Sequence, residues 1–261
     1  MPQYTKTGQT MLGKRFPLRD PRTVARDIPG VLDILFPRLS GGLVTFLNKK
    51  VFHFAEIVAI PDALVEESHL QNAMLFELSF ARAERILNNE MNSDWQTCLQ
   101  TAIERQRRHF DAELPDNLAE IDIYLAEWSA QNLVKMLKSV RDQHPQHELL
   151  LSPVIPGLGW INSGAGDFSL GPILIEVKHT DRNFVAGDFR QVLIYWLLKY
   201  AASLERDQEA WSDCILLNPR RNSGLLVNFD YLIRSASPGL NRLEAYEHLR
   251  SIVGYDIDTS Q

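Results

Sequence analysis

Three charged side chains fall close together in a stretch that is otherwise apolar or rich in glycine. Asp167 follows the segment Ser-Gly-Ala-Gly, and Glu176 and Lys178 flank Val177 in an apolar run. If residues 173–178 form a strand, the alternation of side chains places Glu176 and Lys178 on one face. A buried carboxylate or ammonium is costly unless solvent, an ion pair or a metal ion compensates its charge.

A hairpin would bring Asp167 to the same place. Residues 171–172, Gly-Pro, separate two short apolar runs, which we expect to pair as antiparallel strands. With that turn Leu170 pairs with Ile173, and counting outward places Asp167 directly opposite Glu176 on the same face. Two facing carboxylates repel each other unless a cation lies between them or one is protonated.

The three groups together suit one kind of chemistry. Mg²⁺ prefers oxygen ligands and typically takes one or two carboxylates plus waters and substrate phosphates, so Asp167 and Glu176 could hold it. Lys178 on the same face would orient or deprotonate a water, or stabilise negative charge on a phosphate. This set therefore predicts metal-assisted hydrolysis of a phosphodiester.

The elements that must position these groups follow Pro115. Helical periodicity, alternation and turn residues predict the order helix, three strands, helix, two strands and helix. The expected ranges are 116–143, 148–155, 165–170, 171–180, 184–206, 211–218, 225–233 and 239–254. Strands grouped between helices indicate an α/β fold of the layered, α+β kind.

The first 115 residues are predicted to be mostly helical. The segment 51–60 fits a strand or a buried helix equally well, and Pro29 is expected to break or kink the first helix. Helices are expected over 21–36, 63–89 and 93–114. We therefore expect a helical region over 1–115, which would bind substrate or a partner, and a second domain over 116–261.

The charged constellation resembles the PD-(D/E)XK nuclease superfamily. In that family an aspartate on one strand precedes an acidic-x-Lys motif on the next, here Asp167 and Glu176-Val177-Lys178. The resemblance covers residues 116–261 and implies a restriction-endonuclease-like core, whose element order matches the one predicted here. Gly166 stands where the family motif has proline.

The helix after this motif extends the resemblance. Gln191 and Tyr195 have the Gln-x-x-x-Tyr spacing that follows the motif in RecB-like nucleases, and residues four apart share a helix face. The resemblance implies that Gln191 reaches the active site or substrate, with Tyr195 supporting it. A competing interpretation is that Asp188 caps this helix and Gln191 completes a capping box.

The resemblance also implies a metal cofactor. Mg²⁺, with Mn²⁺ as a substitute, would be held by Asp167, Glu176 and the backbone carbonyl of Val177. The family often adds an acidic residue from its first helix. Glu120 and Glu127 are the available residues, and Glu127 is preferred because it lies nearer the middle of the helix. A solvated helix face is the alternative role for both.

Basic residues outside the motif are the expected contacts of a phosphate backbone. Arg220 and Arg221 lie in a turn between two predicted strands, where arginine forks suit phosphates and a solvated turn is the alternative. Residues 1–50 hold nine Lys or Arg against three Asp or Glu. This basic N-terminus could meet phosphates or an acidic partner, or be a solvated chain end. Its central members are Lys14, Arg15, Arg19, Arg22 and Arg26.

Composition limits the remaining classes. The 261 residues are 45% hydrophobic with a net charge of −6, no apolar run is long enough for a membrane helix, and the first residues lack the apolar stretch of a signal peptide. Two cysteines are too few for a disulfide framework. We therefore expect a cytoplasmic protein without a membrane partner.

The expected function is that of a Mg²⁺-dependent nuclease, an endonuclease or an exonuclease. The expected substrate is DNA, with RNA as an alternative, in phage defence, restriction or repair, as for many members of the superfamily. Because the chain is acidic, we expect that its basic N-terminus, a second copy in a homodimer, or a helicase or ATPase partner helps it to bind nucleic acid. One alternative is an inactive restriction-endonuclease-like scaffold that binds nucleic acid or a protein. Another is a metal-dependent enzyme acting on a substrate other than nucleic acid.

Overall fold

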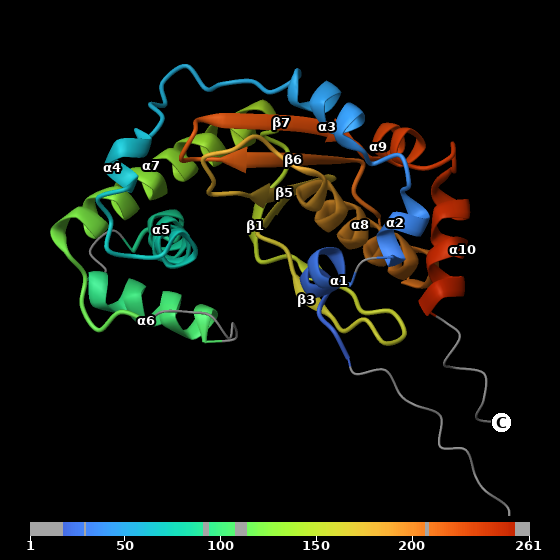
Figure 1. Ribbon diagram of the computed structural model, residues 1–261, viewed down its shortest axis with the longest axis horizontal. Coiled ribbons are helices and arrows are strands. Elements are labelled where there is room, and N and C mark those ends of the chain that lie inside the picture. The colour runs from blue at the N-terminus through green and yellow to red at the C-terminus, as the bar shows by residue number, and fades with distance from the viewer. Residues whose placement is uncertain (1–17, 29, 91–93, 108–113, 207–208, 254–261) are drawn as a thin grey trace, which may run out of the picture.

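The computed structural model describes residues 18–28, 30–90, 94–107, 114–206 and 209–253 (Figure 1). A mixed five-stranded sheet lies at its centre in the order β1-β4-β5-β6-β7. Strands β5 and β6 run parallel, and the other neighbouring pairs run antiparallel. The strands are β1 Leu149–Leu151, β4 Phe168–Leu170, β5 Ile173–Val177, β6 Asp213–Asn218 and β7 Ser223–Asn228. The prediction of a mixed α/β fold is confirmed.

Helices cover both faces of this sheet. Helix α7, Glu120–Gln143, packs on one face, where Ile175 of β5 joins a buried core with residues of α7. Helix α8, Ala186–Arg206, packs on the other face, where Leu174 of β5 is buried against it. The face of β5 that carries Glu176 is therefore the face covered by α8.

The N-terminal helices share their cores with the rest of the chain. Further helices are α1 Pro21–Asp27, α2 Val31–Leu35, α3 Gly41–Asn48, α4 Asp62–Val65, α5 Asn72–Leu87, α6 Trp95–Gln106, α9 Phe229–Ala236 and α10 Arg242–Val253. Val24 of α1 lies in one core with residues of α8, and Phe80 of α5 lies in another with Phe168 of β4. In the part of the chain that the structure describes, no helix has the length and apolar character needed to cross a bilayer.

The β4–β5 turn has the predicted geometry. Gly171 has a φ of +52°, and a Cβ there would meet the ring of His147 at 2.5 Å, so the turn requires glycine. Leu170 pairs with Ile173, which confirms the predicted register. Two further short strands, β2 Val154–Ile155 and β3 Gly164–Ala165, form a separate pair beside the main sheet.

Several boundaries differ from the prediction. The predicted strand 225–233 is confirmed only as far as Asn228, where β7 ends, and its remainder is wrong because α9 follows at once. The Asn228 side chain accepts a hydrogen bond from the Tyr231 N–H at 3.2 Å, as a helix N-cap does, and so ends the strand. Residues 51–60 form neither a regular helix nor a strand, apart from one bridge between Phe52 and Gly224.

The predicted N-terminal helices are shorter than expected. The range 21–36 divides into α1 and α2, with Pro29 between them and outside the described residues. The range 63–89 likewise divides into α4 and α5, separated by residues 66–71. An apolar stripe alone therefore overestimated helix length in this region.

Asn222 connects the irregular segment 52–60 to the sheet through side-chain hydrogen bonds. Its Nδ2 donates to the carbonyls of Phe54 at 2.9 Å and Ile57 at 2.6 Å, and its Oδ1 accepts from the Phe54 N–H at 3.0 Å. Its φ is 49°, a left-handed conformation that asparagine tolerates better than most residues. This segment leads into α4 and α5.

Replacing Asn222 with alanine is expected to lower the free energy of unfolding by about 2–4 kcal/mol, because three hydrogen bonds are lost and alanine disfavours a positive φ. Urea unfolding followed by circular dichroism measures the change. Asn222→Gly is the matched control, since it loses the same bonds but accepts the backbone conformation, and should be about 1 kcal/mol less damaging. Equal stability of Asn222→Ala and the wild type would show that Asn222 does not hold this segment.

Candidate active site

The end of the β4–β5 hairpin brings the three predicted charged residues together. The Val177 N–H donates a hydrogen bond to Asp167 Oδ2 at 2.7 Å. The Asp167 N–H in turn donates to Glu176 Oε1 at 3.2 Å. Lys178 Nζ lies 3.7 Å from Glu176 Oε2. The Asp167 side chain therefore projects toward the motif on β5 and not through the reverse face of the sheet.

Backbone contacts hold Asp167 in this position. Its carbonyl accepts a hydrogen bond from the Ser152 N–H at 2.9 Å, and the preceding Gly166 N–H donates to the Pro153 carbonyl at 2.9 Å. A Cβ at Gly166 would lie 3.3 Å from Glu176 Oε1, tighter than most contacts of a Cβ. Glycine before the aspartate therefore lets the Glu176 carboxylate approach the backbone closely.

Gln191 of α8 links the charged residues to one another. Its Nε2 donates to Glu176 Oε2 at 2.8 Å and to Tyr195 Oη at 3.0 Å. Its Oε1 accepts from Lys178 Nζ at 2.7 Å. One amide therefore fixes the carboxylate, the ammonium and the phenol, and the four-residue spacing of Gln191 and Tyr195 places both on the face of α8 toward β5.

The capping-box interpretation of Asp188 and Gln191 is wrong. Helix α8 begins at Ala186, so Asp188 lies inside its first turn. The Asp188 Oδ2 accepts a hydrogen bond from the Val185 N–H at 2.8 Å. Gln191 consequently lies in the second turn, where its side chain is free of the helix end and faces the site.

Burial and charge act strongly on Glu176. Only 1% of this residue is exposed. Burial, together with the negative charge of Asp167, raises the pKa of the Glu176 carboxyl to about 8, although Lys178 and Arg22 partly oppose the shift. Burial and the same carboxylates raise the pKa of the Tyr195 phenol, which keeps its proton.

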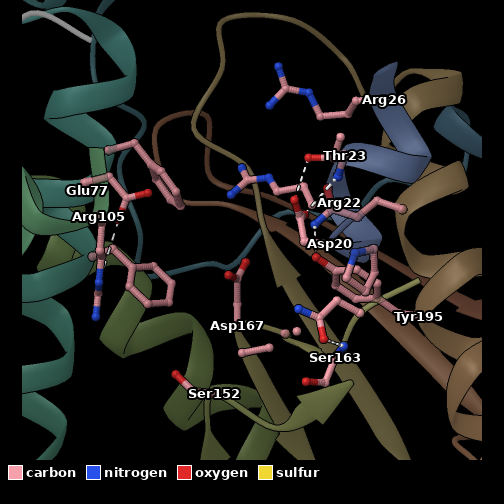
Figure 2. A pocket seen from close by; sticks show the side chains of 18 of the residues that line it. Asp20, Arg22, Thr23, Arg26, Glu77, Arg105, Ser152, Ser163, Asp167 and Tyr195 are labelled. Carbon is pink, nitrogen blue, oxygen red and sulfur yellow. Dashed lines mark hydrogen bonds and ion pairs between the residues drawn. The ribbon is translucent and has the colours of Figure 1, made fainter. Parts of the chain in front are cut away.

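Two adjoining cavities open onto this group of residues. The first, of about 600 Å³, is lined by Asp167, Gln191 and Tyr195 among others (Figure 2). The second, of about 430 Å³, is lined by Val177, Lys178 and Gln191 among others. Because Gln191 borders both, we treat the two cavities as one cleft. Asp167 faces one half of the cleft and Lys178 the other.

Two arginines of the basic N-terminus line both halves of the cleft. Figure 2 shows Arg22 reaching from α1 toward Asp167. The side chains of Arg22 and Arg26 form no hydrogen bond or ion pair with any residue that the structure describes, although the Arg22 backbone N–H donates to the Asp20 carboxylate. Burial lowers the pKa of Arg22, but the charges of Asp167 and other acidic groups give a net rise. Lys14 and Arg15 lie outside the described residues, and Arg19 pairs through its backbone with Trp160.

Helices α5 and α6 form the opposite wall of the cleft. Phe76 and Glu77 of α5 border both halves, and Glu84 and Arg105 border the first half. Arg105 pairs with Glu84 at 2.7 Å and approaches Glu77 to 3.7 Å. Burial raises the pKa of the Glu77 carboxyl despite the positive charges of Arg105 and Arg22. The helical pattern of α5 and α6 in the sequence did not indicate that these residues would line the site.

The other predicted site residues lie elsewhere. The Glu127 carboxylate accepts a hydrogen bond from Arg82 Nε at 2.7 Å and borders neither half of the cleft. Arg220 is buried, and its Nη2 donates to Asp62 Oδ1 at 2.8 Å. Arg221 donates to Asn183 Oδ1 at 2.9 Å, also outside the cleft. The structure therefore does not place these three side chains with Asp167 and Glu176.

Replacing Glu127 with glutamine is expected to leave phosphodiester cleavage within about threefold of the wild type and to cost no more than about 1 kcal/mol of stability, because Glu127 forms a partly exposed ion pair away from the cleft. Steady-state cleavage rates and thermal unfolding measure the two effects. A loss of Mg²⁺ affinity in Glu127→Gln would instead show that Glu127 contributes to metal binding.

The donor set fits a hard divalent cation. Among the residues described, no group of three His, Cys, Asp or Glu side chains is arranged to hold a metal ion. Asp167 and Glu176, with the Val177 carbonyl, nonetheless provide the one or two carboxylates that Mg²⁺ usually takes from a protein. The geometry supports this fit, because both carboxylates lie at the same end of the hairpin: Asp167 Oδ2 accepts from the Val177 N–H, and Glu176 Oε1 accepts from the Asp167 N–H.

Comparisons with known proteins do not extend this description. No protein-family model matches the chain, and no curated protein matches its sequence. The geometry of the cleft is what bears on function: Asp167, Lys178 and Gln191 line it, the Glu176 carboxylate is buried behind them, and Arg22 and Arg26 lie on its wall.

Proposed function

We propose that this protein is a divalent-metal-dependent nuclease of the PD-(D/E)XK type. The observation that carries the proposal is the buried Glu176 carboxylate, which accepts a hydrogen bond from the Asp167 N–H and lies 3.7 Å from Lys178 Nζ, directly behind the cleft that Asp167 and Lys178 line. The arrangement of helix α7, hairpin β4–β5, helix α8 and the parallel strand β6 agrees with the restriction-endonuclease-like core that the sequence resembles. The polar contacts of Gln191 agree with the role that the RecB-like spacing implies.

In this proposal Asp167, Glu176 and the Val177 carbonyl hold Mg²⁺ or Mn²⁺. The bound ion supplies Lewis-acid polarisation of the scissile phosphate and acidifies a water ligand. Lys178 Nζ orients the attacking water or stabilises negative charge on the phosphate, and its hydrogen bond to Gln191 fixes its direction. Tyr195 acts through Gln191 as a positioning residue.

The proposed substrate is nucleic acid, with DNA as the first choice and RNA as the alternative. Arg22 and Arg26 support this choice, because their guanidinium groups lie beside the carboxylates, have no side-chain partner among the described residues and can hold phosphates. Phage defence, restriction or repair in the cytoplasm is the proposed setting. A second copy of the chain, or a helicase or ATPase, would extend the small basic surface of the cleft.

The test is cleavage of single-stranded, duplex and branched DNA and of RNA by the purified protein with Mg²⁺ or Mn²⁺. We expect cleavage that EDTA abolishes and that renewed metal restores. An Asp167→Asn preparation made in parallel controls for contaminating nuclease. If wild type and Asp167→Asn are equally inert on every substrate, the protein is not a nuclease. Nucleic-acid binding without cleavage would instead favour the scaffold alternative.

A further inference from the structure

The shape of the cleft points to the kind of nucleic acid that it accepts, an inference that rests on the proposed nuclease function. The two halves, of about 600 and 430 Å³, are in the size range of pockets that enclose small molecules, about 300–1,000 Å³. Each half therefore has room for one or two nucleotides. Because Asp167 faces one half and Lys178 the other, a strand crossing the cleft passes over the reactive groups at the junction.

The walls of the cleft restrict what can reach this junction. Helix α5 packs on α7 and α6, and α1 packs on α8, so both walls belong to the folded core and are not loose loops. Figure 2 shows Glu77 and Arg105 on one side of Asp167 and Arg22 on the other. In a base-paired duplex a second strand lies beside the first. That second strand would collide with these walls when the first strand entered the cleft.

An aromatic side chain lies where the two halves meet. Phe76 borders both halves and is half-buried, so part of its ring remains open to the cleft. Its ring centroid lies 5.6 Å from that of Phe80 and 6.1 Å from that of His179, which fix its orientation. An aromatic face beside a basic groove is the usual platform for the bases of single strands, whose faces are not covered by pairing partners.

The charges of the second half of the cleft match the backbone of such a strand. The second half has four basic side chains against the carboxylates of Glu77 and Asp188, the basic ones being Arg22, Arg26, Lys178 and Arg182. Arg182 is already paired with Asp188 at 3.2 Å. The side chains of Arg22 and Arg26 lack a partner among the described residues, so they remain available for two phosphates.

We propose that the cleft takes an unpaired strand, DNA or RNA, with one base stacked on Phe76 and adjoining phosphates on Arg22 and Arg26. Intact duplex is excluded from the junction until its end frays. The reacting phosphodiester then lies between the half of the cleft with Asp167 and the half with Lys178.

The binding experiment uses fluorescence anisotropy with labelled single-stranded DNA, single-stranded RNA and a blunt hairpin duplex, in EDTA so that nothing is cleaved. We expect at least about tenfold tighter binding of one or both single strands than of the duplex. Phe76→Leu keeps an apolar side chain but removes the ring, and should weaken single-strand binding by about 5- to 150-fold. Phe76→Trp should bind as the wild type does, and Phe46→Leu, an exposed ring on α3, is the matched control.

Arg22→Gln and Arg26→Gln should each reduce the slope of log affinity against log salt by about one for both kinds of strand. Equal affinity for duplex and single strands, or wild-type affinity in Phe76→Leu, would overturn this inference. Cleavage of blunt duplex that is indifferent to Phe76 would overturn it while the nuclease proposal stands. Phe76-dependent binding without any cleavage would support this inference and overturn the nuclease proposal.

Discussion

Lys178→Met is expected to lower metal-dependent cleavage by about 10³-fold, within the range found when a general acid–base or a charge-stabilising group is removed. The ammonium of Lys178 is held at the junction of the cleft by Gln191 at 2.7 Å and by Glu176 at 3.7 Å. Methionine keeps the length of the side chain and loses the donor, so nucleic-acid affinity should change far less than the rate. Single-turnover cleavage and anisotropy separate the two quantities.

The matched control is Lys138→Met, which removes an exposed ammonium from α7 and should cleave at the wild-type rate. Lys178→Arg retains the charge but not the single-point geometry of the ammonium, and we expect partial activity at most. Wild-type rates in Lys178→Met would remove Lys178 from the mechanism. A parallel loss in Lys138→Met would point to a general effect of charge on binding.

Glu176→Gln is expected to abolish cleavage and yet to raise the free energy of unfolding in EDTA, on the order of 2 kcal/mol or more at pH 8. The reason is the raised pKa of Glu176, about 8 in the folded protein against 4.5 for an ordinary carboxyl. Between these values the unfolded chain is ionised and the folded protein resists ionisation. Wild-type stability should therefore fall as pH rises from about 4.5 to about 8.

Glutamine carries no titrating group, so this part of the pH dependence should be missing in Glu176→Gln. Saturating Mg²⁺ should stabilise the wild type more than the variant, since an ion bound to the folded state adds to its stability. Thermal unfolding at several pH values, with EDTA and with Mg²⁺, measures both effects. A variant less stable than the wild type at pH 8 in EDTA would mean that other groups already compensate the buried carboxylate.

The central part of the site could be predicted because it is local. Asp167 and Lys178 are eleven positions apart, and one tight turn at Gly171 determines how their strands pair. Alternation then decides which side chains share a face. Gln191 follows on the next helix, where its four-residue spacing from Tyr195 was visible in the sequence.

The walls of the cleft could not be predicted because their residues come from distant parts of the chain. The charge of the N-terminus suggested a role for Arg22 and Arg26, but nothing in the sequence showed that α1 packs on α8. Phe76 and Glu77 belong to an amphipathic helix, whose periodicity shows which side is buried and not what the rest faces. For the same reason the helical pattern could not tell that Glu127 faces Arg82.

Local signals failed where two elements meet. Asn228 lies in an apolar run that fits a strand, yet its side chain caps the helix that follows. The spacing of Asp188 and Gln191 fits a capping box, but the helix begins two residues earlier, at Ala186. Such positions depend on where the chain turns to pack, which propensity alone does not determine.

The docking of α1 on α8 also sets an order of events during translation. The ribosome makes Arg22 and its helix before α8, whose apolar side chains, against which Val24 is buried, follow more than 160 residues later. A nascent chain therefore contains Arg22 and Arg26 long before it contains α8, the helix on which α1 packs. The two walls of the cleft can therefore meet only after α8 has been made, so the arginines do not line a cleft in a nascent chain that lacks α8.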